Sequence, residues 1–175
     1  MLKFVLTLAA ATALFAADGP RRAPGFALPD GKMKVYDLYD YRGKPVLLEF
    51  ISTSCPHCLA FSGTIDKARK KYGDRFQVIA VTNPPDNLNN VNQFIAAHKI
   101  DYPVLFDSGQ AAYSYILSGK FDLPQVFLID SQGMIYKQFG YGPSTQDFFE
   151  GDGLITELDR LFGAAKPPAA APKKK

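Results

Sequence analysis

The apolar residues of this chain follow two alternating patterns, short continuous runs and stripes at helical spacing. Pro45–Ile51 (P-V-L-L-E-F-I) and Phe76–Val81 are nearly continuous apolar runs, as expected for strands that are buried on both faces. Leu88–His98 instead spaces its apolar residues so that they fall on one side of a helix. Strands and helices that alternate in this way predict an α/β fold.

The full pattern predicts the element order β-β-β-α-β-α-β-α-β-β-α and a mixed central sheet. The expected strands are Phe26–Leu28, Lys34–Asp37, Pro45–Ile51, Phe76–Val81, Tyr102–Phe106, Gln125–Asp130 and Met134–Phe139. The expected helices are a stretch that follows Cys55 and ends near Tyr72, then Leu88–His98, Gln110–Leu117 and about Thr145–Phe162. Gly31 and Gly133 lie in two of the turns, so the strands on either side of each are expected to form hairpins.

Both ends of the chain differ in composition from the body between them. Residues 1–17 contain one cation, Lys3, and then the apolar run Phe4–Ala17, which is typical of a secretory signal peptide and shorter than the roughly 20 residues of a membrane-spanning helix. An uncleaved membrane anchor is the alternative for this segment. Residues 164–175, rich in Ala, Pro and Lys, are expected to form a disordered tail. One domain is therefore expected over residues 18–163.

The excess of basic over acidic residues in this chain comes from its two ends. The whole sequence has a formal net charge of +3 and a pI near 8.8. Without Lys3 and the four lysines of the tail, the body keeps 15 basic and 17 acidic residues, a net charge of −2. A body with this balance argues against nucleic acid as the partner.

The only two cysteines, Cys55 and Cys58, are separated by Pro56 and His57. A disulfide across two residues closes a short loop and gains little stability, so its value is expected to be redox chemistry. Cys55 lies where a buried strand ends and a helix begins, and the helix N-terminus stabilises a thiolate there. Pro56 suits the first helical turn, and the imidazole of His57 favours the anion further. Cys55 is therefore the expected nucleophile and Cys58 the resolving thiol.

The cysteine pair has two alternative uses. A structural zinc site needs four ligands, and the chain offers two Cys and two His. His57 lies inside the C-x-x-C turn, and His98 lies at the end of a separate expected helix. An inert structural disulfide is the second alternative. The redox interpretation is favoured, with no metal and no cofactor expected.

Glu49 is an acid in the middle of an apolar strand, six residues before Cys55. Between Leu48 and Phe50, it is expected to point into the interior near Cys58, where burial raises the pKa of its carboxyl towards neutrality. The alternative is a carboxylate that reaches solvent or a lysine.

These features resemble the thioredoxin superfamily over about Pro24–Phe162, nearly the whole body. The resemblance depends on the strand, C-x-x-C and helix context, followed by a strand that begins after a proline. The stretch Leu123–Gly133 (L-P-Q-V-F-L-I-D-S-Q-G) looks like the TlpA/ResA-like branch of exported thiol–disulfide oxidoreductases. Leu48–Cys58 (L-E-F-I-S-T-S-C-P-H-C) looks instead like DsbA, whose active site also reads C-P-H-C. Ser54 stands where the family commonly has a tryptophan, which leaves the recognition of a partner's surface open.

The resemblance implies a thioredoxin-like fold with flanking helices, an N-terminal β-hairpin and an inserted strand and helix near residues 76–98. It implies that Glu49 relays protons at Cys58. It also implies a cis bond before Pro124, which sequence alone would predict as trans, and a Leu123 backbone that pairs with an extended partner segment. Expected partners are cysteine-containing envelope proteins and a membrane redox partner, and the expected location is the periplasm or another exported compartment.

Two further functions on the same fold remain as alternatives. A peroxiredoxin-like peroxidase would need proline and threonine where the chain has Leu48 and Ser52. A copper chaperone would need a third ligand close to the sulfurs of Cys55 and Cys58, and His98 is the candidate that the sequence offers. An exported thiol–disulfide oxidoreductase is the favoured function, and the direction of electron flow stays open.

Overall fold

The computed structural model describes residues 21–117 and 122–164. The expected signal segment, residues 1–17, lies outside the described residues. Of the expected tail, only Ala164 is described, and it is the last residue of the final helix. The predicted domain boundaries therefore remain predictions.

The described residues form seven strands, five α-helices and two short 3-10 helices. The strands are β1 (Ala27–Pro29), β2 (Val35–Asp37), β3 (Val46–Ile51), β4 (Gln77–Thr82), β5 (Val104–Phe106), β6 (Gln125–Ile129) and β7 (Ile135–Gly140). The helices are η1 (Leu38–Tyr41), α1 (Pro56–Tyr72), η2 (Gly73–Arg75), α2 (Leu88–His98), α3 (Gln110–Tyr115), α4 (Gln146–Glu150) and α5 (Gly153–Ala164).

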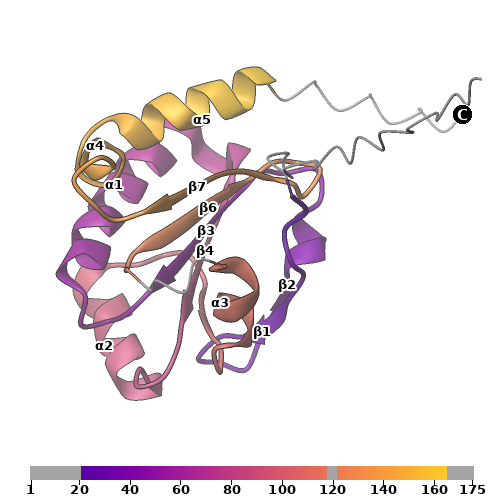
Figure 1. The fold of residues 1–175 in the computed structure, drawn as a ribbon. Coiled ribbons are helices and arrows are strands. Elements are labelled where there is room, and N and C mark those ends of the chain that lie inside the picture. The colour runs from indigo at the N-terminus through magenta and orange to yellow at the C-terminus, as the bar shows by residue number, and fades with distance from the viewer. Residues whose placement is uncertain (1–20, 118–121, 165–175) are drawn as a thin grey trace, which may run out of the picture.

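Five strands form the central sheet, in the order β5-β4-β3-β6-β7 (Figure 1). β3 pairs in parallel with β4, and β4 with β5, whereas β6 runs antiparallel to both β3 and β7. The sheet is therefore mixed, as the sequence pattern predicts. All six residues of β3 are buried, because strands pair with both of its edges and other elements cover both of its faces.

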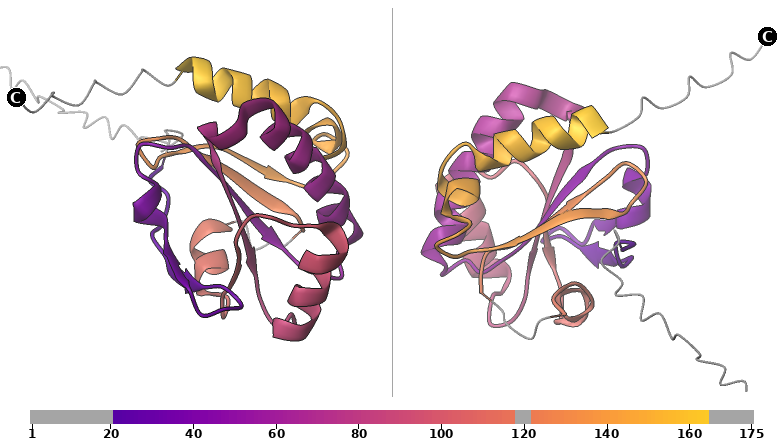
Figure 2. Two further views of the ribbon diagram at one scale, coloured as in Figure 1. Left: turned by 180° about the vertical axis from the view of Figure 1, so that it is seen from behind. Right: turned by 45° about the horizontal axis from the view of Figure 1, so that its top comes forward.

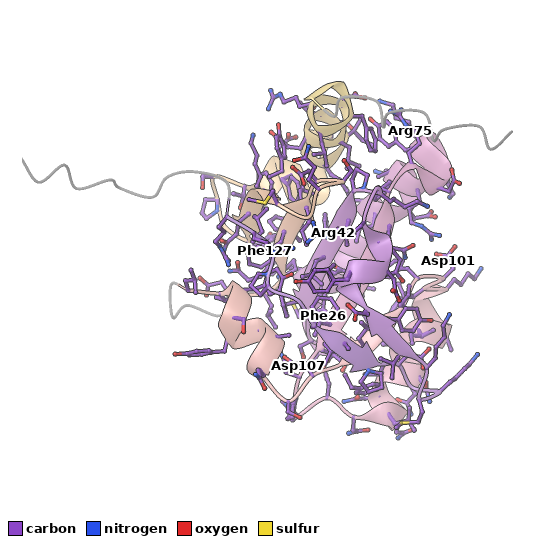
Figure 3. The ribbon with its side chains drawn as sticks, turned by 90° about the vertical axis from the view of Figure 1, so that its right-hand side faces the viewer. Phe26, Arg42, Arg75, Asp101, Asp107 and Phe127 are labelled. Atoms are coloured by element: carbon purple, nitrogen blue, oxygen red, sulfur yellow. The ribbon has the colours of Figure 1, made fainter. Side chains whose placement is uncertain are left out.

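Helices α1, α2, α4 and α5 cover one face of the sheet, and α3 with the β1–β2 pair covers the other (Figure 2). Side chains of β3 alternate between the two layers, as the pleat of a strand requires. Leu47 packs in the core group that contains Phe61 of α1, whereas Leu48 packs with Tyr115 of α3. Phe127 of β6, labelled in Figure 3, belongs to the second group. The two covered faces explain the continuous apolar runs of the central strands.

The N-terminal hairpin forms as a separate two-stranded sheet. β1 and β2 pair antiparallel, with Leu28 opposite Tyr36. Single bridges from Asp30 to Leu105 and from Arg22 to Met134 join this segment to the central sheet. The hairpin predicted from the turn at Gly31 is therefore present.

The prediction of one last helix over Thr145–Phe162 is wrong, because this segment contains two helices. α4 ends at Glu150, and Gly151 leaves the helical conformation with φ −114° and ψ −142°. α5 begins at Gly153, where a Cβ atom would approach the backbone of Phe148 to 2.7 Å. Two glycines within three residues lower the helix propensity, and the packing against α4 requires the second of them.

None of the helices in the described part of the chain combines the length and the apolar character that a membrane span requires.

Candidate active site

Cys55 forms the cap at the start of α1. Its backbone is extended (φ −87°, ψ 112°), and its Sγ accepts a hydrogen bond from the backbone N–H of Cys58 at 3.2 Å. Pro56 lies in the first turn, where a backbone N–H would find no partner within the helix, and proline has no N–H. The local sequence thus places the Cys55 sulfur at the start of α1, beside a backbone N–H that no helical carbonyl accepts.

Cys58 differs from Cys55 in its environment. Its side chain is only 1% exposed, whereas Cys55 is partly exposed, and both are free thiols. Burial raises the pKa of the Cys58 thiol well above its ordinary value, and its hydrogen bond with Cys55 raises it further. The two sulfurs are therefore unequal, one accessible and one shielded.

The segment before β6 lies against the accessible sulfur. The Leu123–Pro124 peptide bond is cis, as the family resemblance implies. The thiol of Cys55 lies 3.6 Å from the carbonyl oxygen of Leu123 and can donate a hydrogen bond to it. The carbonyl of Pro124 accepts from the N–H of Tyr141, so the proline stays within the sheet while Leu123 faces the cysteine.

Glu49 is buried at the centre of the sheet. It lies on β3 opposite Ala80 of β4 and Val126 of β6, and its side chain is only 1% exposed. Burial raises the pKa of its carboxyl to about 8, although a hydrogen bond from the Tyr102 side chain lowers it. The charge of Glu49 contributes to the raised pKa of Cys58, and Ala80, which lies opposite Glu49, packs in the same core group as Cys58. The structure thus brings Glu49, Cys55, Cys58 and Leu123 together.

His57 points towards α4. Its ring stacks on Tyr141, with centroids 3.7 Å apart and an interplanar angle of 20°. Its Nδ1 lies 3.8 Å from Oε1 of Glu150, and the Tyr141 hydroxyl donates to the same oxygen at 2.7 Å. Within the described residues, no hydrogen bond joins His57 to Cys55. Tyr141 and Glu150 were not expected at the site, because their meeting with His57 depends on the packing of α4 against α1.

Asp86 was also missed by the sequence reasoning. Its carboxylate accepts from the backbone N–H of Thr53 at 2.9 Å and from the hydroxyls of Thr53 and Thr82, both at 2.5 Å. Partial burial would raise the pKa of Asp86, but these hydrogen bonds hold it below its ordinary value. Asp86 therefore ties the loop before Cys55 to the end of β4. A polar residue in a turn before a helix suggests a cap, but nothing in the sequence points to Thr53.

Among the described residues, no group of three or more His, Cys, Asp and Glu side chains is arranged to hold a metal ion.

Comparisons with known proteins agree with this geometry. Residues 20–138 match the model of the AhpC/TSA family. The chain is 29% identical over 131 residues to the thiol–disulfide oxidoreductase ResA of Bacillus thuringiensis, covering 75% of this chain and 74% of that protein.

Two solved structures have the same fold as this chain. One is a protein of Chlorobium tepidum assigned as the thiol:disulfide interchange protein DsbE, with a TM-score of 0.69, 29% identity, and coverage of 83% of this chain and 99% of that one. The other is an exposed lipoprotein thioredoxin of Streptococcus pneumoniae, with a TM-score of 0.62, 29% identity, and coverage of 79% and 100%. The chain therefore belongs to the AhpC/TSA family and is a thiol–disulfide oxidoreductase of the thioredoxin superfamily.

Proposed function

We propose that this protein is an exported oxidoreductase that exchanges disulfides with cysteine-containing envelope proteins through Cys55 and Cys58. The observation that carries the proposal is the inequality of the two sulfurs at the start of α1. Cys55 is partly exposed and accepts the backbone N–H of Cys58, whose own sulfur is buried. An accessible thiolate beside a shielded thiol is the arrangement that attack followed by resolution requires.

The proposed exchange has two steps. The Cys55 thiolate attacks a disulfide of the partner, so that a mixed disulfide forms and one partner sulfur leaves as a thiolate. Cys58 then gives its proton to Glu49 and attacks the sulfur of Cys55, which forms the Cys55–Cys58 disulfide and releases the second partner sulfur. The partner gains two electrons and the cysteine pair loses them. The same steps in reverse oxidise a partner.

The raised pKa values give Glu49 its proposed role. Cys58 is a thiol at neutral pH because burial raises its pKa, so it needs a base before it can attack. Glu49 has a pKa of about 8, close to the pH at which a general base works best.

Leu123 and Pro124 form the proposed binding edge for the partner. The Leu123 carbonyl lies 3.6 Å from the attacking sulfur, so an extended segment that paired with this backbone would bring its own disulfide to Cys55. His57 is proposed to stabilise the thiolate by charge alone, with Glu150 as its counter-ion.

The first experiment tests the assignment of the two cysteines. Cys58→Ser should accumulate mixed disulfides with a protein substrate such as insulin, because the resolving thiol is absent. Cys55→Ser, the matched control, should form almost none. Equal amounts of trapped partner in the two variants would contradict the assignment.

A second experiment tests the binding edge. Leu123→Asp should slow exchange with protein disulfides by about tenfold or more, but leave exchange with glutathione disulfide within about twofold, because the small disulfide needs no strand pairing. Leu88→Asp, at a half-exposed position of α2, is the control and should change neither rate. An equal loss with both substrates would refute the edge.

Export is proposed on the apolar run Phe4–Ala17 and supported by the relative in Streptococcus pneumoniae, an exposed lipoprotein. If the protein is exported, the proteins that it meets are envelope proteins, which are therefore its proposed substrates, and its proposed redox partner lies in the membrane. Mass spectrometry of the protein from a fractionated bacterial host should find a mature N-terminus between Ala16 and Gly19 in the exported fraction. A full-length chain in the cytoplasm would overturn export.

A further inference from the structure

The buried carboxyl of Glu49 has a neighbour, Tyr102, that comes from the segment between α2 and β5. Glu49, Ala80 and Val104 lie in register across β3, β4 and β5, so their side chains are on the same face of the sheet. Tyr102 lies two residues before Val104 and packs in the same core layer. Ala80, between the two strands, is fully buried and carries only a methyl group. The small residue leaves room for the Tyr102 hydroxyl to hydrogen-bond with Glu49.

The same tyrosine also reaches the surface. Tyr102 lines a pocket of about 320 Å³ between α1 and the connection from α2 to β5. Arg69 of α1 lies with its guanidinium carbon 5.8 Å from the centroid of the Tyr102 ring and forms an ion pair with Asp101. Asp101 is at the edge of the molecule (Figure 3), and its side chain is 68% exposed. Tyr102 therefore extends from a buried carboxyl to a solvent-accessible pocket.

Glu49 has few other connections. Its Oε2 is buried without a hydrogen-bond partner among the described residues. A buried acid that accepts a proton at each turnover must release it to water, and a closed apolar core offers no path. The side-chain hydroxyl that interacts with this carboxyl is that of Tyr102.

We propose that Tyr102 is a positioning residue for Glu49, holding its carboxyl and connecting it to the solvent of this pocket during the resolving step. The inference rests on the proposed role of Glu49. As Cys58 attacks Cys55, the Cys58 proton moves to Glu49, and the carboxylic acid then passes a proton through the Tyr102 hydroxyl to water in the pocket. The hydroxyl gives one proton to water as it receives another, so the tyrosine is unchanged.

The charged groups around this path come from three elements. Cys58, Asp66, Arg69 and Lys70 lie on α1, His98 ends α2, and Lys99 and Asp101 follow it. Apart from Cys58, they all line the pocket. The direct connection to Glu49 is through Tyr102, whose hydrogen bond lowers the pKa of the carboxyl. Tyr102→Phe removes that bond, so the pKa of Glu49 should rise and less carboxylate should be present at neutral pH.

The test is stopped-flow reaction of the dithiol protein with 5,5′-dithiobis(2-nitrobenzoate), followed from pH 6 to pH 9.5. The first release of thionitrobenzoate reports attack by Cys55, and the second reports resolution by Cys58. Tyr102→Phe should move the pH midpoint of the second phase upward by about one unit, which makes it roughly tenfold slower at pH 7. The first phase should change by less than about twofold.

Three further variants decide between outcomes. Glu49→Gln should slow the second phase by about 100-fold, the usual size of a general-base effect, and Tyr102→Phe in that background should slow it no further. Tyr72→Phe is the matched control, because its hydroxyl bonds the distant Asp159 at 2.8 Å, and it should keep the wild-type profile. Carboxyl carbon NMR of Glu49 in Tyr102→Phe checks the rise in pKa independently of turnover.

The outcomes separate the two proposals. An unshifted profile in Tyr102→Phe, with a slow Glu49→Gln, overturns the role of Tyr102 and leaves the proposed function intact. A wild-type second phase in Glu49→Gln overturns both the proton relay and this inference.

Discussion

The buried carboxyl of Glu49 should make the stability of the fold depend on pH. In the folded protein the pKa of Glu49 is about 8, against an ordinary value of 4.5, because burial disfavours the charged form. Between pH 4.5 and about pH 8, Glu49 therefore carries a proton in the folded state. In the unfolded chain the same carboxyl has already lost that proton. Protonated Glu49 is the form that the core tolerates, so the fold loses stability as the pH rises.

The sign and the size of this effect follow from proton linkage. The contribution of protonated Glu49 to the free energy of unfolding is fully present below pH 4.5. It falls as the pH rises and levels off above about pH 8. The slope is about 1.4 kcal/mol per pH unit, so the loss over the whole window is roughly 5 kcal/mol. A loss of this size is large against the stability of a small domain, which is about 5–15 kcal/mol.

Urea unfolding of the reduced protein at pH 5, 7 and 9 measures this contribution. The free energy of unfolding of the wild type should fall across the series relative to that of Glu49→Gln, which cannot ionise at this position. Glu150→Gln is the control, since Glu150 is exposed and its pKa is lowered rather than raised. Its profile should run parallel to the wild type over this range. Parallel profiles for wild type and Glu49→Gln would refute the reasoning.

The remaining predictions concern the cysteine pair and its supports. Limiting iodoacetamide at neutral pH should label Cys55 at least tenfold faster than Cys58, because Cys58 is buried and its pKa is raised. Peptide mass spectrometry measures the two labelling rates, and faster labelling of Cys58 would reverse the assigned roles. Asp86→Ala should destabilise the fold by about 1–3 kcal/mol in urea unfolding, because the hydrogen bonds from Thr53 are lost. The wild-type potential in a glutathione titration should lie above that of thioredoxin, and His57→Ala should lower it by about 30 mV or less, since His57 acts through charge alone. A potential as low as thioredoxin's would contradict thiolate stabilisation at the helix start.

The sequence predicts well those features that depend on neighbouring residues. The apolar run of β3, the helix that starts after Cys55 and the hairpin around Gly133 each follow from a local pattern, and each is present within one or two residues. The burial of Glu49 follows from its position in that run. The α4–α5 break was missed because the propensity of Thr145–Phe162 is helical overall, and the requirement for Gly153 comes from its contact with Phe148.

What the sequence by itself determined is the redox-active cysteine pair and its setting, because the proposed nucleophile, the proposed resolving thiol and the buried acid lie within ten residues along one strand and one helix start. Only the tertiary structure decided which distant groups surround them. Tyr102 reaches Glu49 from the segment before β5, across Ala80, and Asp86 holds the loop before the cysteines. Glu150 and Tyr141 lie beside the His57 ring. These contacts depend on the register of strands and the packing of helices, which bring together residues far apart in the chain, and no local pattern encodes such pairings.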